Sequence, residues 1–430
     1  MKKSVFLFFI TILLHFGCQQ DSSNAKSSID LDNFILSELK SPVGSGGEPN
    51  LFVSEQGRIY LSWVEYLNDT TDALMFSKIE NDAWTTPTEI SRGTDWFVNW
   101  ADFPSLVVYK NNDQHLAAHW LQKRAAGTYD YDIHIAQSKD GGKTWGESFV
   151  IHTDSVSAEH GFVTMLPQDD GKIFATWLDG RFTKMEGEET APDSHDDHGH
   201  GGGGAMTLRT ATFDIDGKLS DEKELDHRIC DCCQTAAAVT PKKILVAYRD
   251  RSVDEIRDIS FVQKTKESWS SPSLVRADNW KIAGCPVNGP ALANYQNNIA
   301  IAWFTRADEK PKVNVSFYNN EITSFEKPIR VDEGNPLGRV GIELFDDFAM
   351  VSWLEKVGEN AEIKLAQVFS NSLNHQTDKE KFKTITLSKS ITSRRSGFPQ
   401  IEKTADKLIF AWTVADEKKS TVHTAFWKFN

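Results

Sequence analysis

The chain lacks three features that would place it in common classes of protein. It has no excess of basic residues, because 47 Lys and Arg stand against 61 Asp and Glu, for a formal net charge of −14. After residue 14 it has no apolar run of membrane-spanning length, and its short apolar segments show no helical periodicity. These absences argue against nucleic-acid binding, attraction to anionic membrane surfaces and a second membrane-directed segment.

The apolar run that is present lies at the N-terminus and has the features of a secretory signal. Lys2 and Lys3 precede the apolar stretch 5–14, and Gly17-Cys18 follows it. A small residue before cysteine resembles a bacterial lipoprotein signal, in which the cysteine becomes the lipidated first residue. We predict a signal peptide over 1–17, lipidation of Cys18 and a flexible tether over 18–30. The predicted location is the bacterial cell envelope, with a plain secreted protein as the alternative.

Self-similar units follow one another through the rest of the chain. Each contains a short apolar strand that ends in an aromatic residue, at successive separations of 57, 57, 71, 55, 50 and 59 residues by subtraction. These strand ends are Trp63, Trp120, Trp177, Tyr248, Trp303, Trp353 and Trp412. Units of this length without helical periodicity predict an all-β fold, a β-propeller of four-stranded blades over residues 31–430. Seven repeats are counted, and six blades are the alternative.

Two further features of the repeats carry predictions. The seventh unit stops after its third strand, so we expect residues 34–39 to supply the missing outer strand and to close the ring. The long third unit contains an insertion at 184–205, which includes His195, His198 and His200 among glycines. Such a tract binds divalent metals weakly and adventitiously, or passes metal to other ligands.

Arginines gather on one predicted face of this acidic protein. In a propeller, the loops between blades lie on the same face as the loops that join the second and third strands. Guanidinium forks on that face bind carboxylate, sulfate or phosphate, or they pair with neighbouring acids and brace the loops. The candidates for anion binding are Arg181, Arg249, Arg251, Arg306 and Arg339.

Four cysteines beyond Cys18 fall on the same predicted face, three of them in a C-x-C-C pattern. Outside the cytoplasm one reading is a pair of disulfides. A second reading is a soft metal site for copper(I) or zinc, and a third is a reactive thiol. The candidate metal ligands are Cys230, Cys232, Cys233 and Cys285, joined by His160 or His227.

The segment Ser138–Trp145 reads SKDGGKTW and fits the pattern S-x-D-x-G-x-T-W. This string resembles the Asp-box, a β-hairpin turn that recurs in sialidases and other propellers. Asp140 is placed to accept hydrogen bonds from amides of the turn, and the two glycines supply positive φ. The turn joins the two outer strands of a blade, on the face opposite to the ligand side. It therefore predicts a fold rather than an activity.

Together with the tandem units, this motif makes residues 45–430 similar to the sialidase superfamily. The resemblance implies an arginine triad for a sugar carboxylate, a tyrosine nucleophile assisted by glutamate, and an aspartate acid/base. On this chain it nominates Asp179 or Asp250 as the acid and Tyr129 as a tyrosine near the ligand face. The chain departs from the family because it has no early Arg-Ile-Pro signature and no tyrosine after Tyr318.

Three hypotheses for function follow from these patterns. The first is an extracytoplasmic, sialidase-like propeller that binds or hydrolyses an acidic glycan in an arginine-lined axial pocket. The second is a metal-handling lipoprotein centred on the C-x-C-C cluster, with copper or zinc as its cofactor. The third is a non-catalytic assembly scaffold. In each case we expect a monomer that meets the membrane only through its lipid anchor.

Overall fold

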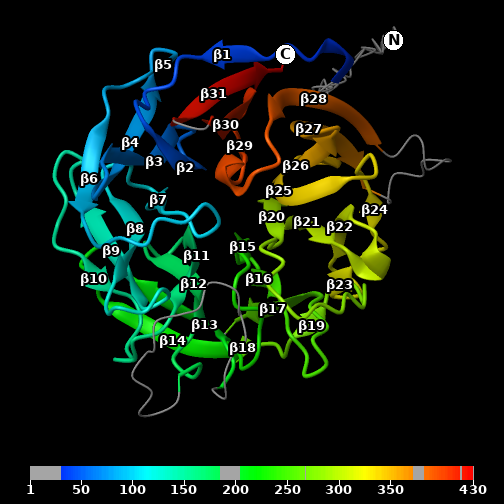
Figure 1. Ribbon diagram of the computed structural model, residues 1–430, viewed down its shortest axis with the longest axis horizontal. Coiled ribbons are helices and arrows are strands. Elements are labelled where there is room, and N and C mark those ends of the chain that lie inside the picture. The colour runs from blue at the N-terminus through cyan, green and yellow to red at the C-terminus, as the bar shows by residue number, and fades with distance from the viewer. Residues whose placement is uncertain (1–30, 185–203, 267, 371–381, 417–418, 430) are drawn as a thin grey trace, which may run out of the picture.

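Short strands with apolar residues on both faces build the molecule, because each blade is covered by a neighbour on either side. The computed structural model describes residues 31–184, 204–266, 268–370, 382–416 and 419–429. Seven antiparallel sheets surround a central axis in these residues (Figure 1). The predicted all-β propeller with seven blades is confirmed, and the alternative of six is wrong. The signal peptide, Cys18, the tether and residues 185–203 lie outside the described residues.

The first three blades contain the strands β2 to β14. In chain order they are β2 (Gly46–Val53), β3 (Ile59–Asn68), β4 (Thr71–Glu80), β5 (Ala83–Trp84) and β6 (Thr88–Gly93) in the first blade; β7 (Ser105–Val108), β8 (Leu116–Lys123), β9 (Tyr131–Ser138) and β10 (Phe149–Val150) in the second; and β11 (His160–Pro167), β12 (Ile173–Asp179), β13 (Thr207–Phe213) and β14 (Leu219–Asp226) in the third.

The other four blades contain β15 to β31 and the N-terminal strand. They are β15 (Ala236–Val239), β16 (Ile244–Arg249), β17 (Ile259–Thr265), β18 (Ser268–Trp269) and β19 (Ser273–Leu274); β20 (Ala291–Tyr295), β21 (Asn298–Thr305), β22 (Lys312–Asn319), β23 (Ser324–Phe325) and β24 (Ile329–Arg330); β25 (Pro336–Leu344), β26 (Phe348–Val357), β27 (Asn360–Phe369) and β28 (Phe382–Ser390); and β29 (Gln400–Lys403), β30 (Lys407–Ala415), β31 (Ser420–Lys428) and β1 (Ser37–Leu39). Single 3-10 turns are η1 (Leu31–Asn33), η2 (Ala307–Glu309) and η4 (Arg394–Ser396).

The ring is closed by strands from opposite ends of the chain. β1 pairs antiparallel with β31, with Ser37 opposite Phe426, and the two strands lie side by side at the rim (Figure 1). The Thr424 hydroxyl donates to the Leu39 carbonyl at 2.8 Å. The predicted closing strand is therefore present in its shorter form, 37–39. Among the described residues, no helix is long and apolar enough to span a bilayer.

Each repeat buries the aromatic residue near the end of its second strand, and in three blades the indole N–H donates to a carboxylate two residues later. The indole N–H of Trp63 donates to Glu65 at 2.7 Å, and that of Trp353 donates to Glu355 at 2.7 Å. In the third blade the Trp177 indole donates to Asp179 at 2.9 Å. A carboxylate two residues after the tryptophan is thus a recurrent structural anchor.

The innermost strands bulge as they approach the axis. Phe162 and Arg339 each follow a glycine and have positive φ values of 54° and 57°, where the registers of β11 and β25 shift. The preceding blade supports each bulge, because Asp102 accepts from the Phe162 amide and Asn288 accepts from the Arg339 amide, both at 2.7 Å. Bulges re-aim side chains, and here they set which residues meet the axis.

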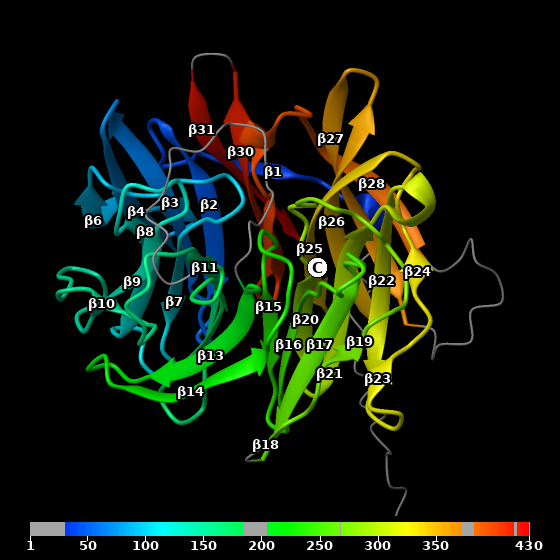
Figure 2. The same ribbon diagram turned by 60° about the horizontal axis from the view of Figure 1, so that its bottom comes forward.

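The turn Ser138–Trp145 connects β9 to β10, away from the inter-blade loops that hold the clusters described below. Asp140 Oδ1 accepts from the Thr144 amide at 2.9 Å, and Gly141 and Gly142 have φ values of 76° and 85°. Trp145 packs edge-on against Phe76 of the first blade, with ring centroids 6.0 Å apart. Figure 2 shows the blades from the side, with hairpin turns and inter-blade loops at the two ends.

We predict that Trp353→Phe destabilises the fold more than Trp412→Phe. Both indole nitrogens are buried, but that of Trp412 has no hydrogen-bond partner in the described part of the chain. Loss of the Trp353 donor leaves the buried Glu355 carboxylate short of a hydrogen bond, at a cost of about 1–3 kcal/mol beyond the shared loss of ring volume. Urea denaturation of the two variants measures the difference. Equal losses would contradict the anchor role.

Candidate functional site

The axis encloses a cavity of about 260 Å³ that is lined by all seven innermost strands. Its lining is mainly apolar, and Asp102, Gln234, Glu343 and Glu402 are among its polar members. The lining contains none of the five predicted anion-binding arginines. Burial raises the pKa of Asp102 to about 7, so this carboxyl holds a proton through part of the neutral range. The cavity is therefore not an arginine-lined pocket.

The segment around Trp100 extends across one end of the axis. Trp100 stacks on Phe398 of the seventh blade, with centroids 5.7 Å apart and planes 18° apart. On the other side of the ring, the Gln234 amide donates to the Ala101 carbonyl at 2.5 Å. Because these partners belong to the fourth and seventh blades, the segment bridges the inter-blade ends of the innermost strands and covers that end of the cavity.

Two arginines lie against this covering tryptophan. The Arg339 guanidinium carbon is 4.7 Å from the Trp100 ring centroid, and that of Arg394 is 5.8 Å from it. Arg339 Nη1 donates to the Ser396 hydroxyl at 2.6 Å. No carboxylate of the described residues lies within ion-pairing distance of either guanidinium. Burial and the charge of Arg394 lower the pKa of Arg339 to about 10, as expected for a cation without a counterion.

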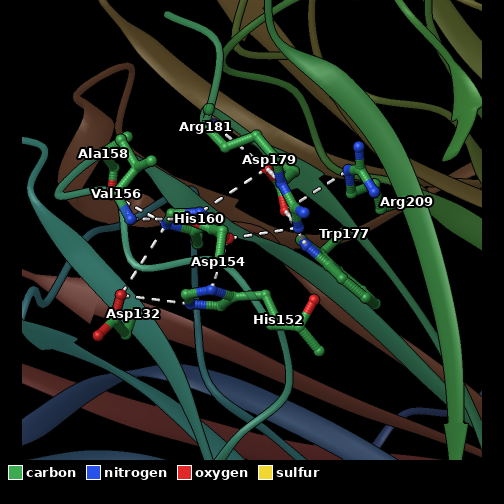
Figure 3. Close-up of polar contacts among 12 residues, drawn as sticks. Asp132, His152, Asp154, Val156, Ala158, His160, Trp177, Asp179, Arg181 and Arg209 are labelled. Atoms are coloured by element: carbon green, nitrogen blue, oxygen red, sulfur yellow. Dashed lines mark hydrogen bonds and ion pairs between the residues drawn. The ribbon is translucent and has the colours of Figure 1, made fainter. Parts of the chain in front are cut away.

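A second cluster fills the junction of the second and third blades (Figure 3). The imidazoles of His152 and His160 are fully buried and stack with centroids 3.8 Å apart and planes 3° apart. Asp154 Oδ2 lies 2.9 Å from His152 Nδ1 and 3.1 Å from His160 Nε2. Asp132 Oδ1 lies 3.3 Å from His152 Nε2. Two imidazoles thus share two carboxylates in a space that excludes water.

Charge balance fixes the protonation of this cluster. Burial alone would lower the pKa of His152, but the adjacent carboxylates of Asp132 and Asp154 outweigh burial and raise that pKa. The same contacts overcome burial at Asp154 and hold the pKa of its carboxyl well below the usual range. The network therefore favours an imidazolium between two carboxylates, which stabilises the junction of the blades.

Asp179 and Arg181 extend the same cluster. Arg181 grips Asp179 with two hydrogen bonds of 2.7 Å, and its Nη2 lies 3.3 Å from Asp154 Oδ2. Although burial opposes ionisation, the Arg181 fork keeps the pKa of Asp179 below its usual value. Asp179 is thus an ionised anchor for Trp177 and Arg181, whereas a general acid must hold a proton near neutral pH. The catalytic role for Asp179 stays a prediction.

Tyrosine and glutamate meet between the two clusters, as the sialidase resemblance implies, but in a buried setting. The Tyr131 hydroxyl donates to Glu159 at 2.9 Å and lies 3.2 Å from Asp102 Oδ2. Burial and these two carboxyls raise the pKa of Tyr131 well above that of free tyrosine. Tyr129, the predicted residue, is 42% exposed and packs edge-on against Phe97. Among the described residues, the structure brings Tyr131 to a glutamate.

Most of the other predicted arginines have protein partners. Arg249 is 2% exposed and donates to the backbone carbonyls of Asn288, Arg257 and Phe304. Arg251 pairs with Glu255 at 2.7 Å and with Asp231 at 3.3 Å. Arg306 is exposed beside η2. Asp250, the other predicted acid, accepts from Ser260 at 2.8 Å, and burial raises its pKa.

The four predicted cysteines converge on the loops between the third, fourth and fifth blades, and all are free thiols. Cys230 Sγ lies 3.6 Å from Cys233 Sγ and 3.9 Å from Cys232 Sγ. Arg257 Nη1 donates to Cys230 Sγ at 3.2 Å. Neither disulfide of the first reading is present. His160 belongs to the cluster with His152, and His227 is exposed beside Asp226.

Sequence reasoning missed Asp132, His152 and Asp154, which hold His160, Asp179 and Arg181 together. No spacing pattern links these residues, because they lie in three different segments of two blades. One signal was available for Asp179: W-x-E or W-x-D recurs at the ends of β3, β12 and β26. That recurrence indicates a structural carboxylate at each position.

No family model and no curated relative matches this sequence. Among solved structures, an ulvan lyase of polysaccharide lyase family PL25 matches 92% of this chain and 96% of its own, with a TM-score of 0.55 and 10% identity. The structure of that lyase bound to -[GlcA(1-4)Rha3S]- matches 92% and 95%, with a TM-score of 0.53 and 10% identity. A protein of unknown function from Dyadobacter fermentans matches 92% and 98%, with a TM-score of 0.52 and 10% identity.

At identities this low, the structural similarity shows a shared fold and nothing more. The β-propeller predicted from the Asp-box and the tandem units is therefore confirmed as a fold.

We predict opposite pH dependences for two buried histidines. Protonated His152 stabilises the fold below its unfolded pKa of about 6.5, and this stability is lost as pH rises through the raised folded value. His152→Gln should therefore cost about 1–3 kcal/mol near pH 5.5 and less near pH 8.5. Urea denaturation at the two pH values measures the change.

His119 provides the matched control. Burial lowers its pKa to about 3, so the wild-type protein loses stability as pH falls below about 6.5. His119→Gln should therefore cost about 1.4 kcal/mol less near pH 5.5 than near pH 8.5. The same direction of change in both variants would show that His152 is neutral in the folded protein.

Proposed function

We propose that this protein is a lipid-anchored, extracytoplasmic propeller that binds an acidic glycan at the end of its axis covered by Trp100. The main support for this site is that the guanidinium groups of Arg339 and Arg394 lie beside the Trp100 ring. The signal-like N-terminus and Cys18 support the location and the anchor. The ligand class is a polysaccharide segment with carboxylate or sulfate groups.

Uncompensated charge distinguishes Arg339 and Arg394 from Arg181 and Arg251, which are occupied by carboxylates. A partly buried guanidinium without a counterion gains more from an anion than one that already has an acid partner. Carboxylate and sulfate oxygens match the fork of arginine, and the indole offers a flat apolar surface beside it. Together these groups suit a charged sugar ring.

Fold similarity points to the same ligand class. The ulvan lyase that shares this fold was solved with a chain of glucuronic acid and sulfated rhamnose. At 10% identity no residue can be carried over, so this likeness supports only the class of ligand.

The proposal is limited to binding because the catalytic groups of a sialidase are poorly provided for. Tyr131 has no exposed surface and a raised pKa, so its hydroxyl is a weak nucleophile. Asp179 is held as an anion by Arg181. Asp250 has the raised pKa of a general acid, and Tyr129 has the exposure of a nucleophile, but no contact joins them among the described residues.

Binding of a glucuronic acid–sulfated rhamnose oligosaccharide to the full chain, measured by calorimetry, tests the proposal. Arg394→Gln should weaken binding about tenfold or more, because an exposed arginine is replaced by a neutral side chain of similar length. Arg339→Lys should weaken it as well, since the ammonium cannot grip an anion with two donors.

The control is Arg330→Gln, which removes an arginine paired with Asp332 on outer strand β24. This variant should bind like wild type, and an uncharged oligosaccharide of the same length should bind more weakly than the acidic one. Equal losses in Arg394→Gln and Arg330→Gln, or no binding by the wild-type chain, would overturn the proposal.

A further inference from the structure

We propose that Cys230, Cys232 and Cys233, with Cys285, form a thiolate centre that binds one thiophilic metal ion, Cu⁺ or Zn²⁺. The centre lies in the loops that lead into the fourth and fifth blades, and Gln234, which follows Cys233, donates to the carbonyl of Ala101 beside Trp100. It does not depend on the proposed glycan binding.

The positions of the sulfur atoms fit a metal ion at their centre. With metal–sulfur bonds of about 2.3 Å, tetrahedral or trigonal geometry separates the sulfurs by about 3.8–4.0 Å. The observed separations from Cys230 Sγ are 3.6 and 3.9 Å, and all three sulfurs lie within 4.8 Å of one another. A disulfide needs about 2.05 Å. The thiols are thus arranged as ligands and not as bonded pairs.

The backbone holds these thiols in place from both sides. The Cys230 amide donates to the Arg249 carbonyl at 3.0 Å, beside the bridge between Ile229 and Asp250. Cys233 immediately precedes Gln234, whose side chain accepts from Gly289 of the next blade at 3.0 Å. Three ligands on one short, anchored loop give a site that exists before the metal arrives.

Burial divides the cysteines into an inner pair and an outer pair. Cys230 and Cys233 are each 1% exposed, whereas Cys232 and Cys285 are partly exposed. Cys285 interacts with Cys232 but is not one of the three cysteines whose sulfurs lie within 4.8 Å of one another. The outer pair therefore offers an entry path, with Cys285 as the fourth ligand when the ion prefers tetrahedral coordination.

A positive charge beside the sulfurs favours thiolate. Arg257 Nη1 donates to Cys230 Sγ at 3.2 Å, and an adjacent guanidinium stabilises a thiolate relative to a thiol. Arg257 itself is fixed by Glu255 at 2.8 Å. Binding replaces the Cys232 and Cys233 protons by the ion: two S–H bonds break, two metal–sulfur bonds form there, a third forms at Cys230, and two protons pass to solvent.

The test is titration of the full chain with Zn²⁺ and, under reducing anaerobic conditions, with Cu⁺, each against a competing chelator. Residues His195, His198 and His200 are replaced by Ala to remove the separate histidine tract. We expect one ion per chain, release of protons, and X-ray absorption with only sulfur neighbours at about 2.3 Å. Cys232→Ser should abolish stoichiometric binding while the thermal unfolding transition is retained.

Two further variants keep the result interpretable. Arg257→Gln should weaken metal binding about 10–100-fold, as expected for a group that supports a ligand without touching the ion. Cys285→Ser should weaken Zn²⁺ more than Cu⁺, because three-coordinate sulfur suits Cu⁺. Retention of the ion in Cys232→Ser, nitrogen or oxygen neighbours alone, or a metal-free chain whose mass shows disulfides would each overturn the proposal.

Discussion

Burial of one large aromatic side chain between each pair of blades is the constraint on which the structure depends. A tryptophan in that position is stabilised further when its indole N–H has an acceptor, because an unsatisfied buried donor costs about 1–3 kcal/mol. In the third blade the acceptor is Asp179. Arg181 forms two hydrogen bonds to that carboxylate and keeps it ionised. The buried indole of Trp177 thus accounts for the position of Asp179, and Asp179 accounts for that of Arg181, in the polar network between the two blades.

This chain of requirements explains why an acidic protein with many arginines on one face has little free positive charge there. Arg181 and Arg251 balance carboxylates, and Arg249 satisfies backbone carbonyls. Arg339 and Arg394 at the Trp100 end have no carboxylate partner among the described residues, whereas Arg257 contacts both the Glu255 carboxylate and the Cys230 sulfur. We propose ligands at both of these places.

The fold could be predicted from the sequence, but the contacts between side chains of different loops could not. Seven aromatic strand ends at regular separations predict seven blades because each blade is formed by one continuous stretch of the sequence. Sorting loops by face also predicts that Cys230 and Cys285 converge. The contact of Arg181 with Asp154 could not be predicted in this way, because it depends on how separate loops fold against one another. His152 was missed for the same reason, since nothing in its neighbourhood marks it.

Hydrogen exchange with and without a sulfated glucuronic acid oligosaccharide tests the central claim most directly. The claim is that the glycan binds at the Trp100 end of the axis and not at the polar network of His152 and Asp179. We predict slower exchange in segments 96–104 and 391–399 on binding, with residues 152–160 unchanged. Protection of 152–160 and 179–184 without protection near Trp100 would contradict this account.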